Sequence, residues 1–484
     1  MSSTLRNIGW KFLERGASQL VSFVVSIVLA RILAPSDYGA VSMVLVFVNL
    51  ANVIVDGGFA GALIQKKDAD ALDFSSVLYF TLGISVLMYA VLFFCAPLIS
   101  SFYGRGYEIL TPVMRVIGVQ VIIFAVNSVQ QAYVARQMMF RNFFWATLVG
   151  TCTSAIVGLV MAYAGYGIWA IVAQQLTSAS VNTFTLYLIT GKLPVLGFSS
   201  ERLKTLLSYG IKLFGASVLI TGYQEVRGLI IGKLYSARDL AFFDRGRQFP
   251  FLISNNINIS VGSVLFPKMS KEQDDIGKIK NSTRLSIRFS AFAMCPLMLG
   301  LAAIAEPAVR LLLTDKWLGC VHLMRWFCIV YLFQPIHTAN MQAIKAIGRS
   351  DVFLKLEVFK KILELLTLLA VMWISVDAIV INMAVLTTLF TVVNAYPNRK
   401  LLNYDFKEQF SDIMSPVLMS VVMMSVILVI NRLIHIGDLW MIMMDILAGG
   451  VVYLGLAVVT KNSEFAYLTR MMINKIKSYG AQDI

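Results

Sequence analysis

The chain has little charge and few residues of the kinds that bind metals. Asp, Glu, Lys and Arg make up 14% of its 484 residues, whereas 58% are apolar, and the mean hydropathy is +0.75. A water-soluble domain could not bury that much apolar surface. The five cysteines and three histidines show neither a C-x-x-C pair nor the spacing of a metal site. The sequence also lacks a G-x-x-x-x-G-K-S/T loop and a zinc-binding helix signature, which argues against ATP hydrolysis and metal chemistry and predicts no cofactor.

The apolar residues form blocks of the length that a bilayer requires, about 20 residues for a hydrocarbon core of about 30 Å. They predict an all-α polytopic membrane protein of about fourteen transmembrane helices. A charged start rather than a cleavable signal precedes the first block, and we expect that block to act as its own insertion signal. The expected spans are 17–33, 40–64, 74–95, 112–134, 143–164, 168–189, 206–231, 249–265, 289–311, 321–341, 353–374, 378–395, 413–434 and 439–459.

The net charge of +14 would suggest nucleic acid as the partner of a soluble protein, but the positive-inside rule gives a simpler explanation here. With the N-terminus placed in the cytoplasm, the inner connections and both termini carry about three times as many Lys and Arg as the outer side. We therefore expect both termini to be cytoplasmic and no nucleic-acid partner.

The first six spans and the next six resemble each other, which predicts an internal duplication. Matching motifs occur in the same order, with an offset that rises from 199 to 210 residues: Gly16-Ala17-Ser18 and Gly215-Ala216-Ser217, Asp37 and Asp239, Pro97 and Pro307, Met114-Arg115 and Met324-Arg325, Phe143 and Phe353. The predicted parts are an N-terminal lobe at 1–195, a C-terminal lobe at 196–405, and two further helices with a tail at 406–484. Because each lobe has an even number of crossings, an axis along the membrane normal should relate the two lobes. A cavity between them would open to either side by alternating access.

Charges inside spanning helices cost roughly 2.5–3.5 kcal/mol each on insertion scales, so those present need a reason. Lys212 and Arg227 lie in the seventh span with a single nearby carboxylate, Glu225. One carboxylate cannot neutralise both cations, and a cation that faces a cavity would suit an anionic ligand such as phosphate. The alternative is a buried structural pair with Glu225. For Arg115 and Arg325, near the outer ends of their spans, the alternative is interfacial snorkelling.

Polar side chains also follow single faces of several spans. The second span carries Asn49, Asn52 and Asp56, and Asn255 and Asn258 occupy the related positions of the eighth. Such stripes predict a polar lumen that suits hydroxyl-rich sugars, and the alternative is hydrogen bonding between packed helices. Similar stripes occur in the fourth and tenth spans, at Gln120, Asn127 and Gln131, and at Gln334, His337 and Asn340.

A charged cluster follows the start of the eleventh span. Its spacing predicts i, i+4 ion pairs of Glu357 with Lys361 and of Lys360 with Glu364, at a cytoplasmic helix end.

Several turn motifs resemble those of a known family, the polysaccharide transporters of the multidrug, oligosaccharidyl-lipid and polysaccharide exporter superfamily, and within it the Wzx-type flippases for colanic acid and O-antigen. The motifs that carry the resemblance are Ala30-Arg31-Ile32-Leu33-Ala34-Pro35-Ser36-Asp37-Tyr38-Gly39, Asp56-Gly57-Gly58-Phe59, Ala62-Leu63-Ile64-Gln65, Gln130-Gln131-Ala132, Gly165-Tyr166-Gly167-Ile168-Trp169-Ala170, and Val264-Leu265-Phe266-Pro267.

The resemblance implies a non-enzymatic flippase of the bacterial inner membrane that moves undecaprenyl-pyrophosphate-linked oligosaccharide to the outer leaflet for lipopolysaccharide or exopolysaccharide synthesis. Membrane lipids, a polysaccharide polymerase and chain-length or export machinery are the other partners expected. The alternatives are a cation-coupled drug antiporter of the same superfamily and a membrane-embedded polymerase or ligase. The candidate substrate-binding residues are Asn52, Arg115, Asn127, Gln131, Lys212, Glu225, Arg227, Asn258 and Arg325.

Overall fold

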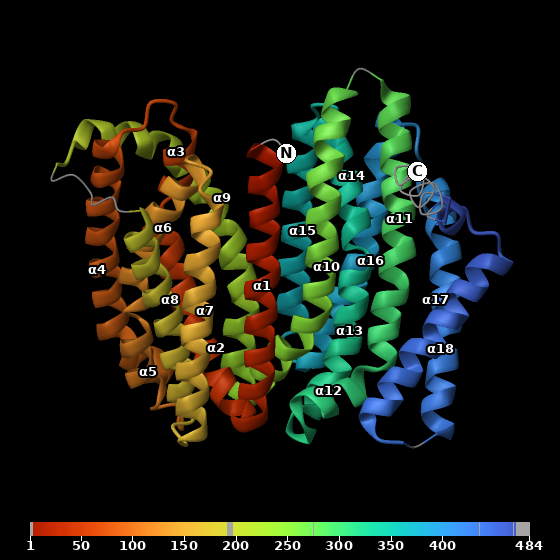
Figure 1. Cartoon of the computed structure of the whole chain (residues 1–484), viewed down its shortest axis with the longest axis horizontal. Coiled ribbons are helices and arrows are strands. Elements are labelled where there is room, and N and C mark those ends of the chain that lie inside the picture. The colour runs from red at the N-terminus through yellow and green to blue at the C-terminus, as the bar shows by residue number, and fades with distance from the viewer. Residues whose placement is uncertain (1–2, 191–196, 274, 435, 468, 471–484) are drawn as a thin grey trace, which may run out of the picture. The chain divides into compact units, whose positions relative to one another are not determined.

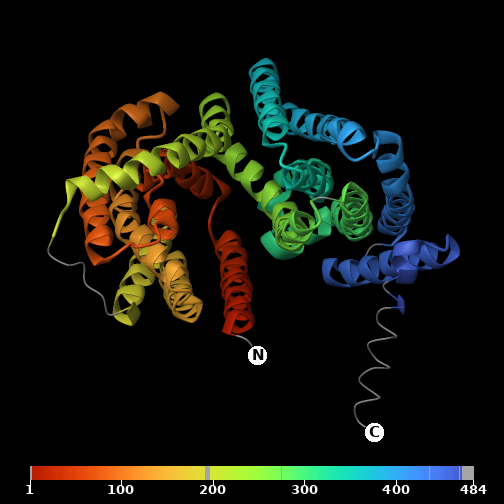
Figure 2. The same cartoon turned by 90° about the horizontal axis from the view of Figure 1, so that it is seen from above.

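The computed structural model describes residues 3–190, 197–273, 275–434, 436–467 and 469–470. The described residues form eighteen α-helices and one 3-10 helix, with no strand among them. Contacts divide the chain into two compact units, Met1–Ala241 (unit 1) and Phe242–Ile484 (unit 2). In both units most helices run side by side (Figures 1 and 2). The lobe boundaries at 195 and 405 come from the repeat rather than from contacts, and they stay a prediction.

Unit 1 contains the helices of the first set of spans and also α9. Its helices are α1 (Ser3–Ile32), α2 (Pro35–Asp56), α3 (Phe59–Gln65), α4 (Ala71–Tyr103), α5 (Leu110–Ile117), α6 (Gln120–Arg136), α7 (Phe140–Tyr163), α8 (Ile168–Thr190) and α9 (Ser200–Leu234). The unit boundary falls in the first turns of α10 (Ala237–Lys271).

Unit 2 contains the rest of α10 and the helices that follow it. These are α11 (Ile276–Ala303), α12 (Ala305–Leu313), the 3-10 helix η1 (Asp315–Cys320), α13 (Val321–Leu332), α14 (Gln334–Ala346), α15 (Ser350–Val371), α16 (Val376–Leu401), α17 (Phe406–Leu433) and α18 (Asp438–Val459). Polar caps set several of the starts, since Asp275, Ser375 and Asp405 each accept a hydrogen bond from a backbone N–H in the first turn.

Each of the fourteen predicted spans lies on one helix or on two consecutive helices, and the all-α membrane fold is confirmed. In the described part of the chain, nine helical segments are long and apolar enough to cross a bilayer. A tenth, α9, bends by 43° between Ser200–Ile211 and Leu213–Leu234. The count of fourteen is consistent with these helices but not established. The remaining helices include α15, where Lys360, Lys361 and their carboxylate partners lower the hydropathy.

The duplication has a counterpart in the backbone. Gly104 ends α4 with φ 113° and ψ −174°, and Thr314 ends α12 with φ 81° and ψ 170°. The two positions are 314 − 104 = 210 residues apart, and their N–H groups bond to the carbonyls of Ser100 and Arg310, which have the same offset. The turn after α6 and the turn after α14 likewise have positive φ at Met138 and Gly348, again 210 apart. Local turn geometry therefore repeats in the register that the sequence predicts.

The α2–α9 seam, the antiparallel contact between these two helices, is built on glycines. A Cβ at Gly232 would lie 3.1 Å from Met43, one at Gly228 would lie 3.2 Å from Val46, and one at Gly58 would lie 2.3 Å from the carbonyl oxygen of Gly210. Glycine allows such backbone approach, as in other membrane helix pairs. The seam thus holds α9 close along the length of α2.

Large apolar side chains cover the outer surfaces of both units. Phe94 on α4, Leu219 on α9 and Val451 on α18 are each more than 70% exposed. A soluble protein does not expose so many large apolar side chains on all sides, whereas a bilayer solvates such a surface. The protein is therefore a multi-pass membrane protein.

Ion pairs gather at helix ends. In unit 1 Arg202 donates to Asp70, which also caps α4, and this guanidinium lowers the pKa of the Asp70 carboxyl. In unit 2 Arg284 joins α11 to Asp412 of α17 at 2.8 Å. The pairs predicted at i, i+4 in α15 are wrong: Lys360 pairs with Glu357, and Lys361 pairs with Glu364 at 2.9 Å, both at i, i+3. Both spacings place side chains on one helix face, and the side-chain rotamers decide between them.

Candidate functional site

The α2–α9 seam contains the first group of predicted residues. Asn49 on α2 donates a 3.0 Å hydrogen bond to the carboxylate of Glu225 on α9. Asn52, one turn further along α2, has a buried side-chain oxygen without a hydrogen-bond partner among the described residues. An unpaired buried acceptor costs about 1–3 kcal/mol. The seam therefore contains a polar group that a bound donor could satisfy.

Arg227 lies two residues beyond Glu225 on α9 and does not pair with it. Its guanidinium donates to the hydroxyl of Tyr223 and lies 4.7 Å from the centre of that ring. No described carboxylate oxygen lies within 4.0 Å of it, and its Nε is buried without a partner in the described structure. Residues two apart on a helix point about 200° away from each other. The described structure therefore contains no ion pair between Arg227 and Glu225, and the half-buried guanidinium of Arg227 has no counter-charge among the described residues.

Lys212, the other predicted cation of the seventh span, lies outside the residues whose side chains the structure describes. Its role stays a prediction.

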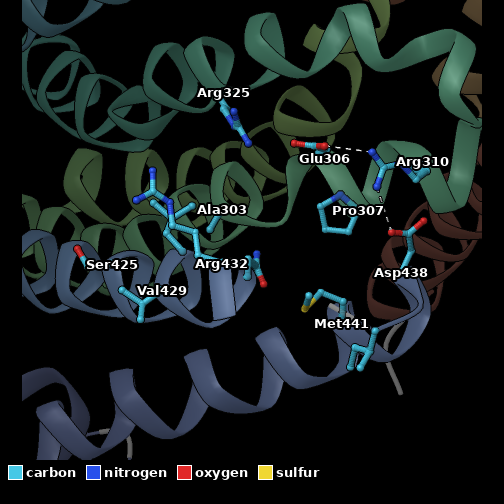
Figure 3. Close-up of a pocket in the computed structure, with 13 residues that line it drawn as sticks. Ala303, Glu306, Pro307, Arg310, Arg325, Ser425, Val429, Arg432, Asp438 and Met441 are labelled. Carbon is cyan, nitrogen blue, oxygen red and sulfur yellow. Dashed lines mark hydrogen bonds and ion pairs between the residues drawn. The ribbon is translucent and has the colours of Figure 1, made fainter. Parts of the chain in front are cut away.

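Arg115 and Arg325 hold related positions in units 1 and 2. The Nε of Arg115 donates to the carbonyl of Phe93 at 3.4 Å, and that of Arg325 donates to the carbonyl of Ala302 at 3.3 Å. Arg115 is partly buried and lies 4.5 Å from the centre of the Phe93 ring. Arg325 is exposed and lines a pocket of about 820 Å³ in unit 2 (Figure 3). The two repeats therefore hold the same residue in different environments.

Asn127 and Gln131 belong to a hydrogen-bonded group between helices. Asn127 donates to Asn182 at 2.9 Å and to Thr183 at 3.0 Å, both on α8, and accepts from Gln131. Asn182 in turn donates to Thr147 on α7 at 3.3 Å. These bonds match the alternative of packing between helices, although Gln131 stays exposed.

The predicted polar residues of unit 2 also form hydrogen bonds between helices. Asn258 on α10 accepts a 3.0 Å hydrogen bond from Thr338 on α14. His337 lies 2.9 Å from the hydroxyl of Thr391. Asn340, fully buried, donates to Gln409 at 2.9 Å, so part of the α14 stripe links helices within the core of unit 2.

The structure thus brings together Asn49, Asn52 and Glu225, and separately Asn127 with Gln131. Tyr223, the partner of Arg227, was not predicted, although a tyrosine one turn before an intramembrane arginine is a readable signal. Arg432, which lines the same pocket as Arg325, was not predicted either. Arg432 lies on the predicted outer side, where the positive-inside rule expects few cations, and this exception is a signal that the sequence offers.

Unpaired buried polar groups inside a membrane protein are functional-site candidates by default. Sequence comparison defines the family. Residues 28–322 match the family described as polysaccharide biosynthesis protein, and the chain belongs to this family.

Curated relatives of this chain are named as polysaccharide transport or biosynthesis proteins. It is 25% identical over 312 residues to the succinoglycan biosynthesis transport protein ExoT of Rhizobium meliloti, a match that covers 64% of this chain and 63% of that protein. It is 23% identical to the teichuronic acid biosynthesis protein TuaB of Bacillus subtilis over 77% of each chain. It is 22% identical to the lipopolysaccharide biosynthesis protein WzxC of Escherichia coli over 69% of this chain and 68% of that one.

Solved structures share the fold. The lipid II flippase MurJ in its inward closed conformation has a TM-score of 0.74 at 13% identity and covers 93% of this chain and 98% of its own. An inward-facing multidrug transporter of the MATE family, in the MOP superfamily, has a TM-score of 0.62 at 14% identity and covers 81% of this chain and 98% of its own. At these identities the likeness defines the fold class alone.

Proposed function

We propose that this protein is a flippase that moves undecaprenyl-pyrophosphate-linked oligosaccharide repeat units from the inner to the outer leaflet of the bacterial inner membrane, for surface polysaccharide synthesis. The observation that carries the proposal is Arg227, a guanidinium within a predicted span that has no carboxylate within 4.0 Å in the described structure. Family membership supports the substrate class.

Arg227, together with Lys212, would hold the pyrophosphate, because a planar guanidinium can donate two parallel hydrogen bonds to phosphate oxygens. The unpaired oxygen of Asn52 lies one turn from the Asn49–Glu225 bond on the same helix, and it would accept a hydrogen bond from a sugar hydroxyl. Arg115, Asn127 and Gln131 would add further polar contacts within unit 1, and Asn258 would be a separate contact within unit 2. The lipid tail would stay in the bilayer, since the exposed faces of the helices are apolar.

The mechanism proposed is alternating access by two lobes, with both termini in the cytoplasm. Transfer of two negative charges out of a negative cytoplasm is favoured by roughly 4–5 kcal/mol per 100 mV. The membrane potential can therefore drive the step without a chemical reaction, and the protein need not be an enzyme. A polysaccharide polymerase and chain-length or export machinery would take the product onward.

The test is leaflet exchange of the polyprenyl-pyrophosphate oligosaccharide in liposomes that contain the purified full-length protein. Arg227→Gln should abolish exchange, Arg227→Lys should reduce it, and Arg105→Gln, which removes an exposed cation from a loop of unit 1, should leave it unchanged. Exchange at the wild-type rate by a folded Arg227→Gln protein would refute the assignment.

A cation-coupled drug antiporter is the second candidate, because Asp445 offers a buried carboxylate. Asp445 lies on α18 and is fully buried, with the side chain of Asn431 on α17 beside its carboxylate. An intramembrane carboxylate of this kind is a functional candidate by default. This reading predicts efflux of a lipophilic cation that Asp445→Asn abolishes, and efflux without lipid exchange would favour it over the flippase.

A further inference from the structure

A pocket in unit 2 gathers three arginines. It has a volume of about 820 Å³ and is lined by residues of α11, α12, α13, α17 and α18, among them Arg310, Arg325 and Arg432 (Figure 3). We call it the arginine pocket. It lies at the end of unit 2 where α12, the end of α17 and the start of α18 are found, opposite the end of α10 and the start of α11 (Figure 1). In the predicted topology this is the outer end, where Lys and Arg are scarce.

One of these guanidinium groups is neutralised and two are not. Arg310 lies 3.1 Å from Glu306, 3.1 Å from Asp315 and 3.7 Å from Asp438. Arg325 donates only to a backbone carbonyl, and neither it nor Arg432 has a carboxylate within 4.0 Å in the part of the chain that the structure describes. Glu306 and Asp438 also line the pocket, but both pair with Arg310. Arg325 and Arg432 are therefore the two cations of the lining that are available to attract an anion.

The other repeat explains how the space arises. In unit 1 the ring of Phe93 lies over Arg115 at 4.5 Å. With the offset of 210 that relates Arg115 to Arg325, the residue that corresponds to Phe93 is Ala303 (303 − 93 = 210), and Ala303 lines the arginine pocket. The C-terminal repeat therefore has a methyl group where the N-terminal repeat has a ring, and its arginine faces open space.

The lining is apolar where it approaches the lipid-facing surface. Leu428, Val429 and Ile436 line the pocket, and Val429 and the nearby Leu433 and Trp440 are more than half exposed. Exposed tryptophans of this kind favour the membrane–water interface. A ligand that contacts both the arginines and the apolar lining has an anionic head and an apolar body.

We propose that the arginine pocket binds the phosphate group of a lipid at the outer leaflet, with Arg325 and Arg432 as the residues that hold it. Guanidinium donors suit phosphate oxygens, and the volume is in the range of small-ligand sites. The phosphate could belong to an anionic phospholipid or to a polyprenyl pyrophosphate. The site uses residues of unit 2 alone and would assign a role to α17 and α18, for which the sequence predicts none.

The test measures binding rather than transport, so its failure and that of the proposed function are separable. Full-length protein in neutral detergent is titrated with phosphatidylglycerol and, in a parallel arm, with farnesyl pyrophosphate, and native mass spectrometry counts the bound molecules. Arg432→Gln should weaken binding about ten-fold, the loss expected for one charge-assisted hydrogen bond. Ala303→Phe should fill the space over Arg325 as Phe93 does in unit 1, and Arg105→Gln serves as the charge-matched control.

Loss of phosphatidylglycerol binding alone would assign the pocket to bulk phospholipid, and loss of farnesyl pyrophosphate binding alone would assign it to a polyprenyl carrier. Either result supports the proposal. Equal binding by wild type, Arg432→Gln and Ala303→Phe in both arms would overturn it, as would an equal loss in Arg105→Gln, which would mean that net charge rather than the pocket attracts the lipid.

Discussion

Exchanging the residues that end α4 and α12 should change stability in opposite directions. Gly104 and Thr314 have nearly the same backbone conformation, with positive φ and ψ close to 180°, a region that is essentially restricted to glycine. A non-glycine residue there costs about 1–3 kcal/mol, and glycine in turn loses roughly 0.5–1 kcal/mol of extra conformational entropy on folding. Thr314→Gly should therefore stabilise the protein by about 0.5–2 kcal/mol, and Gly104→Thr should destabilise it by a similar amount.

The local surroundings make this a clean comparison. A Cβ at Gly104 would meet no atom within 4 Å, so no steric clash adds to the backbone strain. The Thr314 hydroxyl has no hydrogen bond to a described residue, whereas the backbone N–H bonds to Arg310 and Val309 survive the change to glycine. Equilibrium unfolding in mixed micelles with increasing SDS would measure both variants. An unchanged free energy of unfolding in both variants would refute the inference that a strained turn is repeated at these two positions.

Two further changes test the packing and the ion pairs of unit 1. Gly39→Ala should destabilise the protein by at least the roughly 1–3 kcal/mol of an overpacked core, because its Cβ would lie 1.6 Å from the carbonyl oxygen of Ala237; wild-type stability in the same unfolding assay would contradict that contact. Asp70→Asn should keep the cap of α4 but lose the ion pair with Arg202. Because the pKa of Asp70 is lowered in the folded protein, the pair stabilises above the ordinary carboxyl pKa of about 4 and is lost as pH falls through the folded value. The variant should therefore melt lower than wild type at pH 7 and together with it at strongly acidic pH, and a pH-independent difference would argue against the ion pair.

The sequence predicted the helical membrane fold and the register of the duplication because both depend on local composition and order. Bilayer length requires apolar blocks, and the offset of 210 between Met114-Arg115 and Met324-Arg325 recurs in the turns at Gly104 and Thr314. The number of spans was harder to predict, because helices such as α15 carry several charged side chains that lower their hydropathy.

Side-chain partners could not be predicted, because they depend on which helix faces meet. Arg227 and Glu225 seemed a possible pair by proximity in sequence, yet Glu225 bonds to Asn49 and Arg227 to Tyr223. The arginine pocket needs α12 to lie against α18, a contact between residues more than a hundred positions apart. The effect of having Phe93 in one repeat and Ala303 in the other can be recognised only once that packing is known.

The most direct test of the account is the transfer of an undecaprenyl-pyrophosphate oligosaccharide between leaflets of liposomes at a clamped membrane potential. The account predicts that wild-type protein accelerates exchange over protein-free liposomes, that a negative potential on the side corresponding to the cytoplasm favours outward transfer, and that Arg227→Gln removes the acceleration. Exchange no faster than in protein-free liposomes, from folded protein of the correct orientation, would contradict the flippase.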